Sequence, residues 1–175
     1  IREYYRENRN AEIAVISPCL AKRREFDATG LGDYNVTMNS LLAYISNNKI
    51  NLRSYPKIGF DNPPAERAVL FSSPGGLMRT AEREIPEIVE TTRKIEGPAV
   101  VYEYFKNLPG LLRKEMNPQL IDCLNCELGC NGGPGTPNQE KPIDEIEYYV
   151  EKRRKDIQQE LGTNQSTKKA RKTVN

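Results

Sequence analysis

The chain contains no histidine and no tryptophan among its 175 residues. Histidine is the side chain that most often moves protons near neutral pH, and it is also the commonest protein ligand of metals. Its absence excludes histidine-dependent catalytic triads and metal sites built on imidazole. Any chemistry on this chain must therefore use cysteine, carboxylate, lysine or hydroxyl groups.

A strong charge imbalance and long apolar runs are also lacking. The 26 basic and 24 acidic residues give a formal net charge of only +2, which does not indicate a dedicated nucleic-acid binder. No stretch approaches the roughly 20 apolar residues of a membrane span, and no secretion signal opens the chain. We expect a soluble cytoplasmic protein that binds neither nucleic acid nor membrane.

The two ends of the chain differ from its middle. Ile1 is not an initiator methionine, and we expect an upstream part of the same polypeptide to precede it. Residues 162–175 are polar and end in a basic run, which predicts a disordered basic tail. Residues 1–161 are predicted to form one α/β domain fragment.

Short apolar runs alternate with segments of helical spacing along the chain. Strands are predicted at residues 13–17, 68–71 and 119–121. Helices are predicted from a Thr37 cap to about residue 48, at 77–85, at 100–116 with a kink or break at Pro109, and at 142–161. Strands that alternate with helices favour an α/β fold with a mostly parallel sheet and flanking helices.

The glycine pair Gly75-Gly76 lies between the predicted strand at 68–71 and the helix that follows. Backbone amides at a helix N-terminus can bind an anion or a partial negative charge. A plain connection between a strand and a helix would show the same pattern. The pair is a candidate binding element only together with other observations.

The four cysteines are the main candidates for chemistry. Cys123, Cys126 and Cys130 are spaced C-x2-C-x3-C before a glycine-rich run, and Cys19 follows a predicted strand far earlier in the chain. Cysteines in a chain without a secretion signal indicate metal or redox sites rather than disulfides. Three interpretations fit these residues: an iron–sulfur cluster, a structural zinc bound by all four thiols, or buried cysteines without a ligand.

Three motifs resemble those of iron-only hydrogenases and occur in the same order along the chain. The segment SPCLAKRREF around Cys19 is similar to the family's second cysteine motif. The segment SPGGLM that begins at Ser73 resembles the Gly-Gly turn that passes close to the metal site in that family. The run CELGCNGG that begins at Cys126 is similar to the third motif. The resemblance covers roughly residues 11–151.

This resemblance implies a fold and a cofactor. The fold would be about half of a two-lobed hydrogenase catalytic domain. The cofactor would be a cubane [4Fe–4S] cluster joined through one cysteine to a di-iron centre that carries CO and cyanide. Cys19 and Cys126 would ligate the cubane, and Cys130 would form the bridge to the di-iron unit. Cys123 is an extra thiol and a further candidate metal ligand.

The resemblance also implies roles for four residues around the cofactor. Lys22 would donate a charged hydrogen bond to a cyanide nitrogen. Glu25 would hold Lys22 or the local backbone, and the amides of Gly75 and Gly76 would face cyanide or carbonyl groups. The alternative for Lys22 and Glu25 is an exposed charged turn.

The chain also departs from the family's pattern. The family's first motif, which supplies the remaining cubane ligand and a proton-shuttling cysteine, is expected upstream of Ile1. Ser17, Pro74 and Leu124 stand where active enzymes usually have Met, Thr and Met. With these differences, the chain resembles a sensory branch of the family, in which the hydrogenase-like domain is joined to signalling modules.

The intact protein is therefore expected to reduce protons to hydrogen reversibly, or to sense hydrogen or redox state, with ferredoxin or a signalling domain as partner. The isolated chain is expected to be inactive, and to hold no metal if it is purified in air. Two alternatives stay open: an electron-transfer module with only the cubane, and a zinc-stabilised interaction domain.

Overall fold

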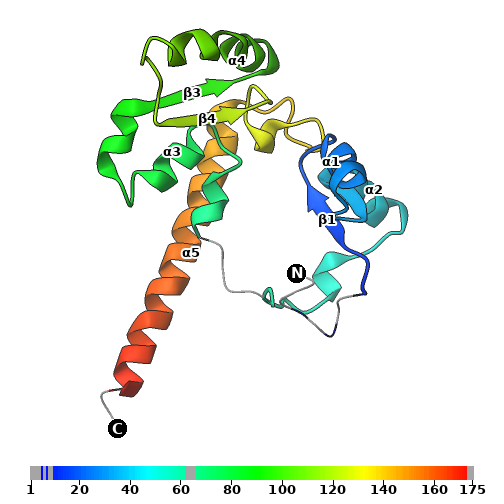
Figure 1. Ribbon diagram of the computed structural model, residues 1–175. Helices are drawn as coiled ribbons and strands as arrows, with labels where there is room; N and C mark the ends of the chain where they lie inside the picture. The colour runs from blue at the N-terminus through cyan, green and yellow to red at the C-terminus, as the bar shows by residue number, and fades with distance from the viewer. Residues whose placement is uncertain (1–4, 6, 8–9, 62–65, 173–175) are drawn as a thin grey trace. The chain divides into compact units, whose positions relative to one another are not determined.

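A computed structural model describes residues 5, 7, 10–61 and 66–172 (Figure 1). The chain divides into two compact units. Unit 1 comprises Ile1–Pro56 and Gly133–Gln139, and unit 2 comprises Lys57–Gly132 and Glu140–Asn175. Each unit is built around one pair of parallel strands, so the expected α/β fold with parallel strands is confirmed.

Unit 1 contains β1 (Ala14–Ser17), α1 (Lys22–Thr29), β2 (Tyr34–Thr37), α2 (Met38–Asn47) and the 3₁₀ helix η2 (Leu52–Ser54). In the sheet, Val15 lies opposite Asn35 and Ser17 opposite Thr37. The side chain of Thr37 accepts a hydrogen bond from the Ser40 amide at 3.1 Å and so caps α2. The first predicted strand, the cap and the end of this helix are confirmed.

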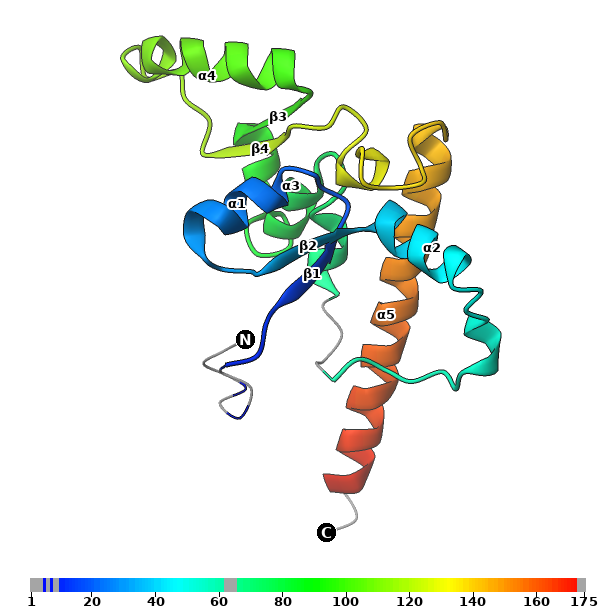
Figure 2. The same cartoon turned by 90° about the vertical axis from the view of Figure 1, so that its right-hand side faces the viewer.

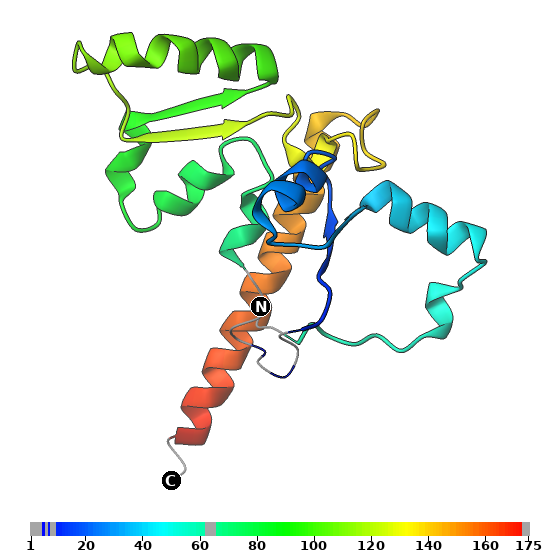
Figure 3. The same ribbon diagram turned by 45° about the vertical axis from the view of Figure 1, so that its right-hand side comes forward.

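Unit 2 contains η3 (Arg67–Leu70), α3 (Gly76–Ala81), η4 (Pro86–Thr91), β3 (Thr92–Glu96), α4 (Pro98–Leu112), β4 (Leu120–Leu124), η5 (Cys130–Gly132) and α5 (Ile143–Lys172). The pair β3–β4 lies between α4 on one side and α3 on the other (Figure 3). Helix α4 runs through Pro109 without the predicted break.

The apolar core lies mainly in unit 2. Its buried apolar side chains are Leu70, Ile88, Ile95, Val101, Ile146 and Ile157. Two of them, Ile146 and Ile157, belong to α5, and each is only 4% exposed. In the described part of unit 1, Phe26 is the buried large apolar side chain, and a Cβ atom on Gly32 would lie 3.1 Å from its ring.

The strand predicted at residues 68–71 is wrong, because η3 occupies this position. A four-residue apolar run is too short for its period to separate strand from helix. Leu70 is buried, whereas Phe71 is 47% exposed, so no continuous apolar strand is formed here. The helix after it is also shorter than predicted and ends at Ala81.

Strands β2 and β3 were not anticipated from the sequence. β3 has the sequence TRKIE, in which Ile95 is the single buried apolar side chain. One apolar residue among charged ones does not produce a recognisable strand pattern. The strand predicted at 119–121 is present but extends to Leu124. The parallel strands therefore form two separate pairs instead of one sheet.

Helix α5 begins beside Pro142 as predicted and continues to Lys172, past residue 161 (Figure 2). The backbone is helical at residues 162–172, and residues 173–175 lie outside the described part, so the disordered basic tail expected at residues 162–175 stays a prediction. Within residues 5, 7, 10–61 and 66–172, no helix is both long and apolar enough to cross a membrane.

Candidate metal centre

Cys126 and Cys130 lie on one tight turn that follows β4. The Gly129 amide donates to the Cys126 carbonyl at 3.0 Å, and Gly129 has a left-handed φ of 69°. The Cys130 amide donates to the Ser72 carbonyl at 2.8 Å. A Cβ atom at position 129 would lie 2.6 Å from the same carbonyl oxygen, so the close approach requires glycine. We call residues 126–130 the cysteine turn.

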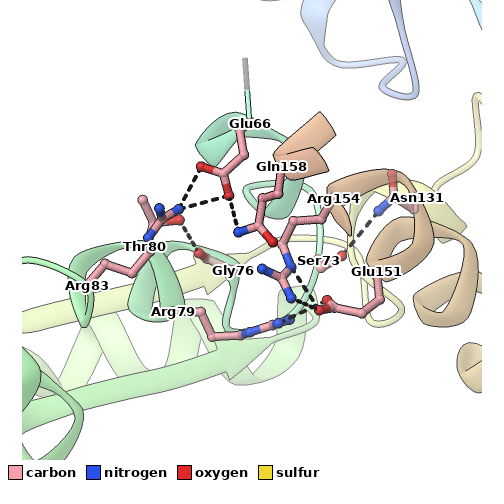
Figure 4. A network of polar contacts seen from close by, with 10 residues as sticks. All are labelled: Glu66, Ser73, Gly76, Arg79, Thr80, Arg83, Asn131, Glu151, Arg154 and Gln158. Atoms are coloured by element: carbon pink, nitrogen blue, oxygen red, sulfur yellow. Dashed lines mark hydrogen bonds and ion pairs between the residues drawn. The ribbon is translucent and has the colours of Figure 1, made fainter. Parts of the chain in front are cut away.

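A second turn, residues 72–76, packs directly against the cysteine turn. Besides the bond from Cys130 to Ser72, the Asn131 side chain donates to the hydroxyl of Ser73 at 3.4 Å (Figure 4). Ser73 is only 1% exposed, which makes it the most buried side chain of this region. Two of the motifs that resemble hydrogenase motifs are thus side by side within unit 2. We call residues 72–76 the glycine turn.

The glycine pair of this turn is required by the backbone. Gly75 precedes α3 with a left-handed φ of 74°, a conformation that favours glycine. A Cβ atom on Gly76 would lie 1.6 Å from the Leu70 carbonyl oxygen, so no other residue fits there. The pair therefore has a structural reason independent of any ligand.

The first amides of α3 are already engaged within the protein. The Gly76 amide donates to the Ser73 carbonyl at 3.0 Å, and the Met78 amide donates to Asp122 Oδ2 at 2.9 Å. Asp122 is 3% exposed, and its carboxylate lies where the partial positive charge of the helix favours it. The Gly76 amide thus has an acceptor within the protein, and the expectation that the Gly75 and Gly76 amides face cyanide or carbonyl groups stays a prediction.

Cys19 lies in unit 1, in the loop between β1 and α1. The Ser17 hydroxyl accepts from the Cys19 amide at 3.2 Å and donates to Asn35 Oδ1 at 2.7 Å. Asn35 Nδ2 donates to the Cys19 carbonyl at 2.8 Å, which closes a ring of hydrogen bonds around the cysteine backbone. The conformation of this loop is therefore held by two side chains, one at the end of β1 and one within β2.

The glycine-rich run after Cys130 also packs against the Cys19 loop. The Gly135 amide donates to the Pro18 carbonyl at 3.1 Å, and the Asn39 amide donates to the Gly135 carbonyl at 3.0 Å. A Cβ atom on Gly135 would lie 2.6 Å from the Pro18 carbonyl oxygen. The run therefore supports the loop that carries Cys19.

Lys22 and Glu25 form an ion pair on the first turn of α1, with 2.5 Å between Nζ and Oε2. Their side chains are 41% and 45% exposed. Both the role suggested for Glu25, which was to hold Lys22, and the alternative of an exposed charged turn are compatible with this pair. A hydrogen bond from Lys22 to a cyanide stays a prediction.

Cys123 differs from the other three cysteines in its position. It lies inside β4, opposite Ile95 of β3, and it is exposed. Its neighbour Asp122 points to α3, and successive side chains of a strand point to opposite faces. Cys123 is therefore directed to the other face of the sheet.

The residues fit an iron–sulfur centre by the chemistry of their donors. None of the four cysteines is in a disulfide, and Cys19, Cys126 and Cys130 are half-buried in loops stabilised by backbone hydrogen bonds. Thiolates are the usual ligands of such clusters. Across the described residues, no three side chains of the metal-binding types are gathered into one group.

Two carboxylates of unit 2, Glu66 and Glu151, accept hydrogen bonds from arginines (Figure 4). The hydrogen bond from Arg154, with further help from Arg79, lowers the pKa of Glu151 to about 2. The hydrogen bond from Arg83 likewise lowers the pKa of Glu66, aided by Gln158. Both carboxylates are therefore charged at neutral pH.

Sequence reasoning did not identify the supporting residues of the site. Asp122 and Asn131 lie next to cysteines, but no local pattern distinguishes them from surface polar residues. Asn35 bonds to Ser17 and to the Cys19 carbonyl because β2 pairs with β1, and this pairing is not visible in the sequence. Only Ser17 carried a signal, because it replaces the methionine that the resemblance leads one to expect.

Comparison with known proteins supports the resemblance. No curated protein matches the chain significantly. The family model for the C-terminal domain of the iron only hydrogenase large subunit matches residues 1–134. This region contains β1 to η5, both turns and all four cysteines. Because the match covers most of the chain, the protein belongs to this family, the C-terminal domains of iron-only hydrogenase large subunits.

Proposed function

We propose that this chain provides the cysteine-bearing part of a hydrogenase-type iron–sulfur centre. The observation that carries the proposal is the direct contact of the cysteine turn with the glycine turn through the Cys130–Ser72 hydrogen bond. Two motifs more than fifty residues apart in sequence meet there, as expected for segments that share a ligand. Members of the family bind a [4Fe–4S] cluster joined to a di-iron centre.

The family resemblance implies three ligands on this chain. Cys19 and Cys126 would bind the cubane, and Cys130 would bridge to the di-iron centre. When bound, the cofactor supplies electron transfer and a binding site for hydrogen species. The upstream part of the same polypeptide would supply the fourth cubane ligand.

The residues around the cysteines would set the orientation of these ligands. Hydrogen bonds to ligand-bearing segments orient the ligands and tune the metal centre. The ring formed by Ser17 and Asn35 would hold Cys19, and the Ser72 carbonyl would hold Cys130. Lys22, steadied by Glu25, would supply a cation beside the cofactor.

In the intact protein, this centre would sense hydrogen or redox state, or reduce protons reversibly. Ser17 favours sensing over rapid turnover, because the hydroxyl at this position is committed to hydrogen bonds with Cys19 and Asn35. The methionine usual in active enzymes cannot make these bonds. A signalling domain would then be the partner, and ferredoxin would be the partner of a catalytic protein.

The proposal is tested by anaerobic reconstitution of the chain with iron and sulfide in competition with zinc. Metal analysis and electron paramagnetic resonance of the reduced sample are expected to show a cubane, with an added thiol in place of the upstream ligand. Stoichiometric zinc and no cluster would instead support an interaction domain. If no metal binds even when the upstream segment is added, the proposal fails.

Single cysteine substitutions test the ligand assignment. Cys126→Ser and Cys130→Ser are each expected to abolish cluster retention, since each removes a thiolate ligand. Cys123→Ser is the matched control and is expected to retain the cluster, because this exposed residue points to the other face of β4. Iron and sulfide content per chain is the measurement. Equal loss in all three variants would overturn the assignment.

A further inference from the structure

Helix α5 lies beyond the residues matched by the family model, which end at 134, yet it packs against η3 and η5, which adjoin the glycine turn and the cysteine turn. Its buried residue Ile146 reaches the end of the cysteine-bearing segment, where a Cβ atom on Gly132 would lie 3.6 Å from Ile146 Cδ1. Further along the same helix, Ile157 is equally buried. The family resemblance therefore does not account for an element that contacts the candidate site.

One ion-pair cluster connects α5 to α3. Glu151 Oε2 lies 2.9 Å from Arg79 of α3, and Glu151 Oε1 accepts from Arg154 Nε at 2.8 Å (Figure 4). Arg154 also donates to the same oxygen through its terminal nitrogen. These side chains are only partly exposed, so solvent screens their attraction less than on an open surface.

A second cluster connects α5 to the segments on either side of α3. Arg83, just after α3, places Nη1 at 2.9 and 2.7 Å from the two oxygens of Glu66, which lies just before η3. Gln158 of α5 donates to Glu66 at 2.8 Å. Glu66 is 8% exposed, so this carboxylate depends on both partners.

The connection continues from α3 to the cysteines. Arg79 lies one helical turn after the Gly75-Gly76 pair, and the Asp122 carboxylate fixes Met78 between them. In the glycine turn, the Ser72 carbonyl accepts a hydrogen bond from the Cys130 amide. A shift of α3 would therefore move the backbone that holds Cys130.

We propose that Glu151 and Arg154 of α5 are positioning residues for the candidate metal centre. They hold α3 in place, and α3 holds the glycine turn against the cysteine turn. This inference rests on the proposed function, because the centre being positioned is the proposed metal centre. The positioning of the thiols can nevertheless be measured without a cofactor.

The test is the alkylation rate of each cysteine in the metal-free, reduced chain, followed by mass spectrometry. In Glu151→Gln, we expect Cys126 and Cys130 to react about five-fold faster, because local opening exposes the cysteine turn. Cys123, on the other face of β4, is the internal reference and is expected to keep its rate. Glu160→Gln, at an exposed site on the same helix, is the matched control.

The outcomes distinguish a specific effect on the cysteine turn from a general destabilisation of the protein. Unchanged rates at Cys126 and Cys130, or an equal rise at all three cysteines, would overturn the proposal. If Glu151→Gln does not fold, Arg79→Lys is the milder variant, since it keeps the cation but loses the fork of the guanidinium. Its expected rise is about two-fold at the same two cysteines and none at Cys123.

A second readout keeps this inference distinct from the proposed function. After reconstitution with iron and sulfide, Glu151→Gln is expected to hold less cluster than the unaltered chain, and Glu160→Gln is expected to match it. If the unaltered chain takes up no cluster, the proposed function fails, whereas the alkylation rates still decide whether α5 positions the thiols.

Discussion

At the scale of single residues, Ser17 has a role that the resemblance to active hydrogenases would not suggest. It is 5% exposed, and its hydroxyl both accepts from the Cys19 amide and donates to Asn35. The smaller residue therefore does not simply enlarge a pocket. Its hydroxyl supports the loop that carries Cys19 through hydrogen bonds.

This role predicts a specific effect of Ser17→Ala. The change removes the acceptor of the Cys19 amide and the donor to Asn35 Oδ1, which is expected to destabilise the protein by about 1–2 kcal/mol. Urea unfolding measures this free energy, and the alkylation rate of Cys19 is expected to rise with it. Ser46→Ala, an exposed serine of α2 in the same unit, is the control. Similar effects of the two substitutions would contradict the proposed ring of hydrogen bonds.

The candidate ligands could be named from the sequence because cysteine chemistry and spacing are local properties. Their supports could not. The Ser72 carbonyl that accepts from Cys130 is a backbone group, and any residue type carries one. Likewise, Asp122 and Asn131 are polar residues whose partners lie many positions away in the chain. Only the folded chain shows which of them support the site.

At the scale of secondary-structure elements, ion pairs join α3 and α5, so the position of α3 depends on α5. The six residues of α3 are too few for a helix to be stable alone, so its position depends on neighbours. Asp122 holds its first turn, and the two ion-pair clusters hold its middle and its end. The long, highly charged α5 thereby acquires a buried face through arginine and glutamate pairs as well as isoleucines.

The ion pairs predict a definite pH dependence of stability. Arg154 and Arg79 lower the pKa of Glu151 from 4.5 to about 2. Because this pKa is lower in the folded state than in the unfolded state, the ionised Glu151 carboxylate stabilises the fold fully above about pH 4.5. This stabilisation is lost as the pH falls from 4.5 towards 2. Glu151→Gln is therefore expected to cost about 1 kcal/mol at pH 7.

The measurement is urea unfolding of both proteins from pH 7 to pH 2.5. The difference in free energy of unfolding is expected to be constant above about pH 5 and to shrink below about pH 4.5. Glu160→Gln controls for the loss of one carboxylate on the same helix. A difference that grows on acidification would have the wrong sign and would refute the role of this ion pair.

At the scale of the whole molecule, each of the two units contains one parallel strand pair, and the family match runs through both. Among the described residues, the buried apolar core belongs almost wholly to unit 2. Unit 1 combines Phe26 with hydrogen-bonded loops and the returning segment Gly133–Gln139. The glycine-rich segment Gly133–Gln139 therefore contributes to the packing of unit 1.

The last part of α5 gives a prediction at this scale. The contacts of α5 with η3, α3 and η5 described above involve residues from Ile146 to Gln158. Deletion of residues 162–175 is therefore expected to leave the melting temperature unchanged within about 2 °C. A deletion that starts at residue 156 would remove Ile157 and Gln158 as well and is expected to lower it clearly. Thermal unfolding followed by circular dichroism compares the two. A large drop on the shorter deletion would show that the end of the chain is docked.

The sequence by itself determined the α/β class, the family and the cysteines that are candidate metal ligands. These depend on local features, namely apolar periodicity, glycine positions and motif spacing. The tertiary structure alone decided that the strands form two pairs and that Cys123 faces away from Asp122. It also decided that the Gly76 amide is engaged and that α5 holds α3. The reason is that strand pairing, backbone hydrogen bonds between turns and ion pairs between helices join segments far apart in the chain, and short-range patterns do not encode such partners.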